Sequence, residues 1–434
     1  MINGMRAAPA VLWAIGLLLV SACPKGTPPE TDPAEYAPEL TEQVPDRFYS
    51  DTTSEGSYDG NWLADFNDPR LEAIVVEAMQ SNFSLRSAAA NLEVSAAVAK
   101  QADRRLEPIV ALSLPTGVGD QGTGTTASFG TSLDIVWEPD IWGEISSGQA
   151  AALADFQAAR ATFEGARLSL AGQVTKAWFL ATQVWRQLEL TRATRDNLQG
   201  VLDLTLERQR LGQASEQDLR LTRADLAATE DAVRNLEGAY EDAKRSVEVL
   251  LGRYPAAEIE VPLEFIAMPG PVPVGLPSEL LQRRPDVIAA DRRVAASFAR
   301  VDSAQAAKLP SLTLTGSLGT ASNDLGGALD PANAIWNVGA NLLVPILDQG
   351  GRQLGVEITT AQQEAAVADY AATGLRAFNE VESTLMQESV LADREGFLEQ
   401  SAEDNREAYR LAELQYNVGA IDQLSLLQIQ TRVF

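Results

Sequence analysis

Apolar residues first recur at helical spacing in the segment from Asp68 to Leu106. Asp68 is a residue type that caps helix N-termini, and Pro69 suits the first helical turn, where its missing N–H removes no hydrogen bond. Apolar residues then follow every three or four positions, which is typical of an amphipathic helix. Pro108 ends the pattern, because proline cannot continue the hydrogen bonding of a helix.

The period of the pattern changes to two after Pro108. Alternate residues are apolar from Ile109 to Leu114 and again from Thr126 to Trp137, with a Gly- and Thr-rich loop between the two segments. Segments of roughly nine to twelve residues with one apolar and one polar face are typical of transmembrane β-strands. A soluble, half-buried sheet alternates in the same way. We predict a strand pair over 109–138.

A long helical hairpin is predicted next, over 144–252. No proline occurs between Glu144 and Arg210, and a helix of that length spans about 100 Å. Leu211 and Gly212 interrupt the helix formers, and a second helix returns through about Leu251. Within the first helix, apolar residues recur every seven positions, the spacing of a coiled coil: Phe156, Phe163, Leu170, Ala177 and Val184.

The whole pattern then occurs a second time. Pro310 ends a helix as Pro108 does, 202 residues later, and strands are predicted over 310–345. The second break, at Val418–Gly419, lies 207 residues after the first. The chain is therefore predicted to contain a first repeat at 61–252, a linker at 253–277 and a second repeat at 278–434.

The second repeat is shorter than the first at its C-terminal end. In the first repeat the returning helix runs from about residue 214 to 251, whereas the second hairpin, at 350–434, ends thirteen residues after Ile421. We expect a C-terminal truncation, and therefore poor assembly of this chain.

The first 22 residues read as an export signal. Arg6 is the only charge before an apolar run from Val11 to Val20, and Ser21, Ala22 and Cys23 follow. Cys23 is the only cysteine, and its position directly after the signal predicts lipidation of the mature N-terminus; an ordinary signal peptide with an incidental cysteine is the alternative. Residues 23–60 are acidic and proline-rich, which predicts an extended tether.

Composition excludes several function classes. The net charge is −26, so the chain would repel nucleic acid. The absence of histidine removes Ser-His-Asp and Cys-His catalysis and every His-ligated metal site. With five methionines, soft ligands for copper or silver export are few. We predict no catalytic residues, no cofactor and no metal site.

Four strands cannot close a barrel, and open strand edges are forbidden in lipid because unpaired backbone groups are costly there. Strands must therefore be pooled between subunits. Two chains would supply eight strands, enough for a barrel nearly filled by side chains, and three would supply twelve, which leaves a lumen.

Four segments carry a family resemblance: "LLQRRPDVIAADRRVAASFARVDSAQAAKLPSLTLTGSLG" at 280–319, "NWLADFNDPRLEAIVVEAMQSNFSLRSAAANLE" at 61–93, "WEPDIWGE" at 137–144 and "RQRLGQASEQDL" at 208–219. The chain resembles the outer-membrane efflux protein family, the TolC-like outer-membrane factors, and within it the lipoprotein branch. The resemblance covers about residues 60–434, and Cys23 agrees with it.

The resemblance implies a mainly α fold with a small membrane β part. Three subunits would form a twelve-strand β-barrel in the outer membrane, continuous with a twelve-helix tunnel in the periplasm. The implied partners are outer-membrane lipid, a periplasmic adaptor and an inner-membrane efflux transporter, for which the chain would be a passive exit duct. A protein secretion duct and a lipid-anchored periplasmic coiled-coil scaffold without a pore are the alternatives.

The resemblance also assigns residues at the hairpin tips. Leu211 and Gly212 in the first copy, and Val418 and Gly419 in the second, match the tips that meet adaptor hairpins. Asp218 and Tyr416 match a polar link that holds the tunnel closed, which predicts a hydrogen bond between them.

The tips also depart from the family pattern. Ser425 and Gln428 stand where acidic residues are expected at the narrowest point, so a cation-binding constriction is in doubt. Ile421 and Gln415 replace expected arginines, whereas Arg208 keeps the arginine of the first copy.

Overall fold

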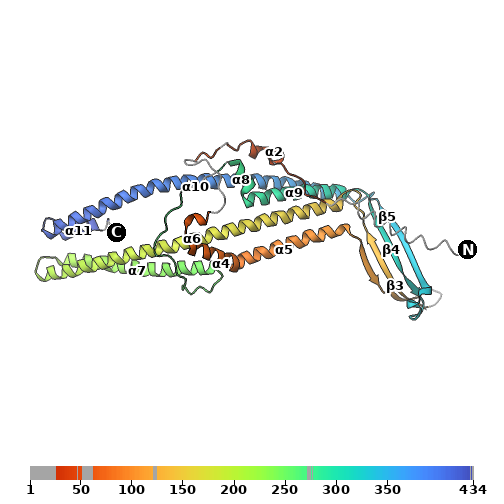
Figure 1. Cartoon of the computed structure of the whole chain (residues 1–434), viewed down its shortest axis with the longest axis horizontal. Helices are drawn as coiled ribbons and strands as arrows, with labels where there is room; N and C mark the ends of the chain where they lie inside the picture. The colour runs from red at the N-terminus through yellow and green to blue at the C-terminus, as the bar shows by residue number, and fades with distance from the viewer. Residues whose placement is uncertain are drawn as a thin grey trace. The chain divides into compact units, whose positions relative to one another are not determined.

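The computed structural model describes residues 26–45, 47–50, 62–120, 125–270, 275, 277–430 and 432. It divides into two compact units. The first contains 89–163, 281–377 and the described residues up to 44, and the second contains the remaining described residues. Helices α6 (Glu144–Arg210) and α10 (Gly351–Asn417) each contribute to both units (Figure 1). Among the described residues, no helix has an apolar stretch long enough to cross a membrane.

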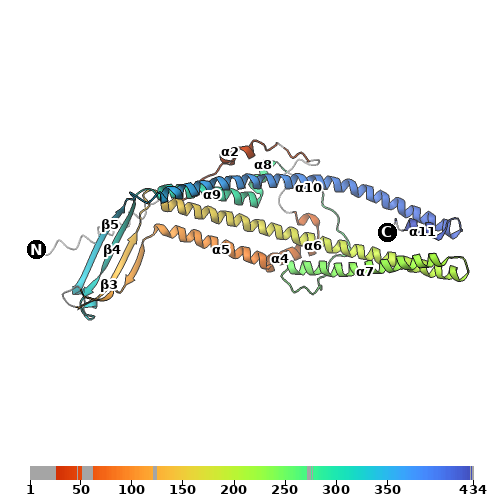
Figure 2. The ribbon, with the colours of Figure 1, turned by 180° about the vertical axis from the view of Figure 1, so that it is seen from behind.

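The first unit contains a single antiparallel sheet. Its strands are β1 (Ile109–Ser113), β2 (Thr116–Asp120), β3 (Thr125–Trp137), β4 (Ser311–Ser322) and β5 (Ala334–Leu343). Their order is β1-β3-β4-β5, and β2 pairs with β3 beyond the end of β1. Pro115 separates β1 from β2, and its carbonyl accepts a hydrogen bond from Gly130 N at 3.0 Å. β1 and β2 thus form one interrupted edge of the sheet, and β5 forms the other; β3, β4 and β5 lie side by side in both views (Figures 1 and 2).

Alanine-rich packing joins α6 to α9 (Pro285–Ala306) in the first unit. Two clusters of buried alanines lie between these helices, and because each side chain is a single methyl group the backbones approach closely. The members are Ala150, Ala151 and Ala299 in one cluster, and Ala154, Ala295 and Ala296 in the other.

The described residues up to 44 differ from the extended tether that the composition of 23–60 predicted. Residues 33–41 form two short helices, α2 (Pro33–Tyr36) and α3 (Pro38–Thr41). The Tyr36 and Thr31 hydroxyls both donate to Asp291 Oδ1 at 2.9 Å, and Tyr36 meets the Tyr370 ring edge-on at 5.1 Å between centroids. Proline content predicted an open chain, but Pro33 and Pro38 each begin a short helix, and the contacts of Thr31 and Tyr36 hold this part of the segment on the helices of the first unit.

The second unit packs α4 (Pro69–Ser81) and the beginning of α5 (Phe83–Asp103) against α6 and α7 (Glu216–Leu250). Asp68 caps α4, because its carboxylate accepts hydrogen bonds from Arg70 N and Leu71 N. The fully buried Trp178 indole lies 3.4 Å from the other oxygen of that carboxylate, toward which its N–H points. The predicted cap residue therefore also contributes to the core.

A buried carboxylate at the end of α7 organises the chain that follows. Glu248 accepts hydrogen bonds from the backbone N–H groups of Ala257, Glu258 and Ile259 at 2.7–3.0 Å. Burial alone raises the pKa of Glu248, but these donors and the nearby Lys244 outweigh it and hold the pKa below its usual value. Since the folded chain favours the ionised form, this contribution to stability is present above the ordinary glutamate pKa and is lost as the pH falls through the lowered one.

Candidate functional site

The sheet has one face that is apolar and exposed. Its strand register aligns Leu112 with Leu133, Leu133 with Leu318, and Leu318 with Trp336, so one apolar row crosses all four neighbouring strands. These side chains are 72%, 40%, 60% and 73% exposed, respectively. A half-buried soluble sheet would cover this row with a helix or a second sheet, whereas no described residue covers it here.

The opposite face of the sheet is polar. The residues next to the apolar row on these strands are also aligned: Asp134 with Ser317, and Ser317 with Asn337. The Asp134 carboxylate accepts hydrogen bonds from the hydroxyls of Ser113, at 2.6 Å, and Ser132, at 3.0 Å. An apolar face for lipid and a hydrogen-bonded polar face for water are what a membrane-spanning strand requires.

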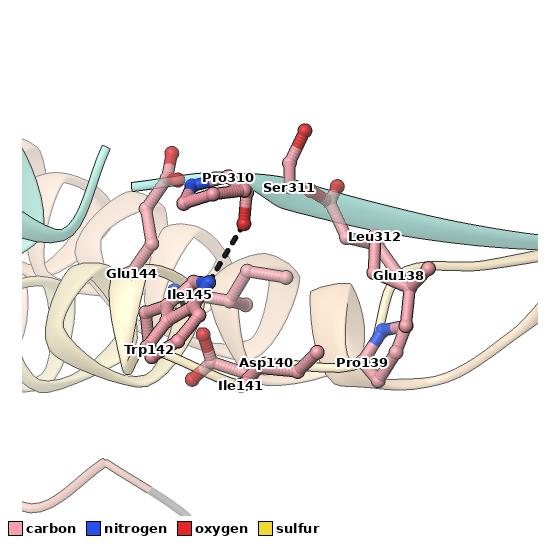
Figure 3. A pocket seen from close by; sticks show the side chains of 10 residues that line it. All are labelled: Glu138, Pro139, Asp140, Ile141, Trp142, Glu144, Ile145, Pro310, Ser311 and Leu312. Carbon is pink, nitrogen blue, oxygen red and sulfur yellow. Dashed lines mark hydrogen bonds between the residues drawn. The ribbon is translucent and has the colours of Figure 1, made fainter. Parts of the chain in front are cut away.

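The passage from strand to helix is fixed by the segment after Trp137 (Figure 3). The Asp140 carboxylate caps α6 by accepting hydrogen bonds from Ile145 N at 2.9 Å and Ser146 N at 2.8 Å. Gly143 has φ +80°, a conformation that favours glycine, and Trp142 Nε1 donates to the Pro310 carbonyl at 2.7 Å. A hollow of about 20 Å³ remains between these groups.

This junction ties the two repeats together, since Pro310 directly precedes β4. Sequence reasoning used "WEPDIWGE" only as a family mark and did not assign a role to Trp142. The signal that could have suggested a role is a tryptophan, whose ring carries a polar N–H, directly before a glycine that forms a turn.

The first hairpin tip is a compact, capped turn. Gly212 has φ +70° and ends α6, and Gln213 N donates to the Arg208 carbonyl at 2.7 Å. Ser215 and Asp218 then form a capping box at the start of α7, because each side chain bonds the backbone N–H of the other. The Ser215 hydroxyl, which donates to the Asp218 carboxylate at 2.7 Å, and the Ser215 N–H hold the pKa of Asp218 below its usual value.

The second tip repeats this construction, but the serine and the aspartate of the cap exchange places. Gly419 has φ +78°, and Ala420 N donates to the Gln415 carbonyl at 2.8 Å, the same spacing as in the first tip. Asp422 precedes α11 (Gln423–Gln430) and accepts a hydrogen bond from Ser425 N at 2.8 Å. Ser425, at a position where an acid was expected, is therefore the counterpart of Asp218 at the helix start, and Gln428 is exposed one turn further on.

The predicted hydrogen bond between Asp218 and Tyr416 is not formed within the chain. The capping box engages Asp218, whereas the Tyr416 ring lies under the Arg208 guanidinium at 4.2 Å from its centroid. The Tyr416 hydroxyl is buried and has no hydrogen-bond partner among the described residues. The Ser215 hydroxyl and N–H bond the same Asp218 carboxylate within this chain, and the latch stays a prediction.

The adaptor-contact residues of the prediction lie together at these tips. Leu211 is 63% exposed and Val418 is 81% exposed, beside Gly212 and Gly419. Cys23, the predicted lipidation residue, lies outside the described residues. Among the described residues there is no group of acidic or cysteine side chains that could hold a metal ion.

A five-strand sheet with one exposed apolar face, followed along the chain by helices of 67 residues, defines an outer-membrane channel subunit with a helical extension. The chain belongs to the outer membrane efflux protein family, whose model matches residues 74–253 and 276–434.

Individual relatives agree with this family. The pyoverdine export outer membrane protein OpmQ of Pseudomonas putida is 28% identical over 96% of this chain and 90% of its own length. The toluene efflux pump outer membrane protein TtgF of Pseudomonas putida is 27% identical over 86% of this chain and 80% of its own. The crystal structure of the open state of the MtrE outer membrane channel of Neisseria gonorrhoeae has 26% identity and a TM-score of 0.81, covering 90% of this chain and 89% of its own.

These comparisons confirm three predictions made from the sequence. The family is the one that the motifs resemble, the fold class is mainly α with a small sheet, and the function class is that of an outer-membrane efflux channel component. The family is one of efflux proteins rather than of enzymes.

Proposed function

We propose that three copies of this chain assemble into a passive exit duct, through which an inner-membrane pump and a periplasmic adaptor expel small molecules. The observation that carries the proposal is the sheet: its exposed apolar face is suited to lipid, and its two edges, β1–β2 and β5, have no strand partner among the described residues. Open edges cannot persist in lipid. Three chains would pair all of them in a twelve-strand ring with a lumen.

Two observations favour this function over the alternatives. A lipid-anchored coiled-coil scaffold without a pore would not need the exposed row from Leu112 to Trp336. Two relatives are named for export or efflux, one of them for toluene, a small molecule, which favours small-molecule transport over protein secretion.

The duct predicts a trimer that conducts ions. The chain purified from membranes in mild detergent should run as a trimer band in unheated electrophoresis samples and as a monomer after boiling. Added to a planar bilayer, it should give discrete conductance steps. A water-soluble monomer that stays silent in bilayers, made from the full chain with its signal, would refute the duct.

We also place the protein in the outer membrane with its helices in the periplasm and a lipid on Cys23. The signal-like segment before Cys23, and the absence of another cysteine, support the lipid. Mass spectrometry of the mature N-terminal peptide tests it: a peptide that begins at Cys23 without an added lipid mass would exclude the anchor.

We propose that the two tips contact the adaptor through Leu211 and Val418. Both apolar side chains are exposed at capped, hydrogen-bonded turns, which suits a partner that docks end-on. Cysteine at either position should crosslink to a co-expressed adaptor. Leu180→Cys, at a side chain 50% exposed in the middle of α6, is the matched control and should not crosslink. Equal yields at all three positions would mean that the tips are not the docking site.

A further inference from the structure

A polar groove lies over α9 in the first unit. It has a volume of about 490 Å³ and is walled by α6 on one side and α10 on the other. Arg293 and Arg300 project into it from α9, Asp155 from α6, and Thr359 and Gln362 from α10. A volume of this size accommodates a small organic molecule.

The two arginines lie seven residues apart, so they share one face of α9, and each meets α6 at a different level. Arg300 forms an ion pair with Asp155. One heptad further along the antiparallel pair of helices, Arg293 meets a hydroxyl instead, and donates to Thr162 Oγ1 at 3.2 Å. Both arginines thus contact α6 in the same way, but the partner of Arg300 is a carboxylate and the partner of Arg293 is a neutral hydroxyl.

The positive charge of Arg293 is therefore not compensated. It has no carboxylate partner among the described residues, and the single acid in the wall of the groove is already paired with Arg300. The groove consequently carries a net positive charge in a chain whose net charge is −26. With 60 acidic residues available, an arginine that faces a cavity without one points to a ligand that brings the negative charge itself.

The duplication supports a special role for this groove. The offset of 202 residues between Pro108 and Pro310 aligns Arg293 with Asn91 and Arg300 with Val98 on α5. Neither charge is present in the first copy. The arginines are thus not required by the packing of the repeated unit.

We propose that the groove binds a small organic anion through a carboxylate or phosphate group. The Arg293 guanidinium would bind the anionic group, because its planar N–H fork matches such oxygens. Arg300 would hold Asp155 away from the ligand, and the side chains of Thr359 and Gln362 would bind its polar remainder. That the anion is cargo in transit rests on the duct proposed above; the binding site itself does not.

Calorimetry on the purified full chain tests the site, with citrate and inorganic phosphate as probes. At least one probe should bind the unchanged chain, and Arg293→Gln should raise its Kd about tenfold or more. Arg293→Lys should retain part of the binding. The matched control is Arg292→Gln, which removes the same charge from the neighbouring residue, paired with Asp291 at 2.5 Å, and should leave the Kd unchanged.

Bilayer recordings separate this inference from the duct. A chain that never conducts but binds citrate or phosphate through Arg293 would refute the duct and keep the site.

Two results would overturn the anion site. The first is that neither probe binds the unchanged chain. The second is equal affinity of the unchanged chain and Arg293→Gln; if that variant also weakens the trimer band, Arg293 is a contact between subunits.

Discussion

Replacing Leu318 with arginine should prevent stable insertion of the protein into membranes. Leu318 stands in the centre of the apolar row, between Leu133 and Trp336, and is 60% exposed. On the lipid face of a membrane strand, an arginine costs about 2–4 kcal/mol at the midplane of the bilayer. Every subunit of a trimer would carry the change, so the cost would apply three times. We expect the heat-modifiable trimer band and the bilayer conductance to be lost, or reduced at least tenfold.

The adjacent residue supplies the control. Ser317 is next to Leu318 on β4, but its register partners are Asp134 and Asn337 on the polar face. Ser317→Arg adds the same side chain at the same depth and should leave the trimer band in place, because that face meets water. If the two variants failed equally, or if Leu318→Arg assembled normally, the apolar face would not be the lipid face.

The elements whose signals are local could be predicted closely from the sequence. The proline-free stretch predicted a helix from Glu144 to about Arg210, and α6 has these bounds. Alternation predicted strands that start after Pro108 and Pro310, and β1 and β4 do so. These signals are reliable because a missing N–H or a period of two acts within a few residues, whatever the remainder of the chain does.

Contacts that depend on a competing partner could not be predicted in this way. Asp218 is assigned to a latch by the resemblance, and that latch stays a prediction; the contact that was not predicted is the capping box with the nearer Ser215. Tyr36 belonged to a segment with the composition of a tether, yet it bonds Asp291, 255 residues further along the chain. The periodicity of the sequence predicts neither contact, since each depends on which group lies nearest to the side chain in the folded protein.

The charge of the groove on α9 illustrates the same limit. "RRPDVIAADRRVAASFAR" marked the family, but nothing in its pattern distinguished Arg292 from Arg293. Only the fold pairs Arg292 with Asp291 and turns Arg293 toward a cavity. Arg293 is therefore a candidate site residue because of the groups that surround it in the fold, and not because of the composition of its segment.

Gly319→Ala should break the pairing of the two repeats within the sheet. Gly319 lies opposite Ser132, where β4 of the second repeat meets β3 of the first. A Cβ at this position would fall far inside contact distance of the Thr131 carbonyl oxygen and 2.8 Å from Ser132 Cα. Both obstacles are backbone atoms, so no side chain can move aside and β3 must shift. Forced overpacking of this kind costs about 1–3 kcal/mol per chain, and it acts on the pairing that joins the repeats. We expect the trimer to dissociate at a clearly lower temperature in heated electrophoresis samples.

Gly316→Ala on the same strand is the matched control. Its added methyl group would find its nearest neighbours at 4.0 Å, the Asn337 carbonyl oxygen and Ile135 Cβ, which is ordinary contact. The two substitutions have the same effect on the unfolded chain and on strand propensity, because both replace glycine with alanine three residues apart. A difference between them therefore reports the close approach of β4 to β3 alone. Equal dissociation temperatures would mean that β3 and β4 are not paired in this register, and that the apolar row from Leu112 to Trp336 is not aligned across the repeats.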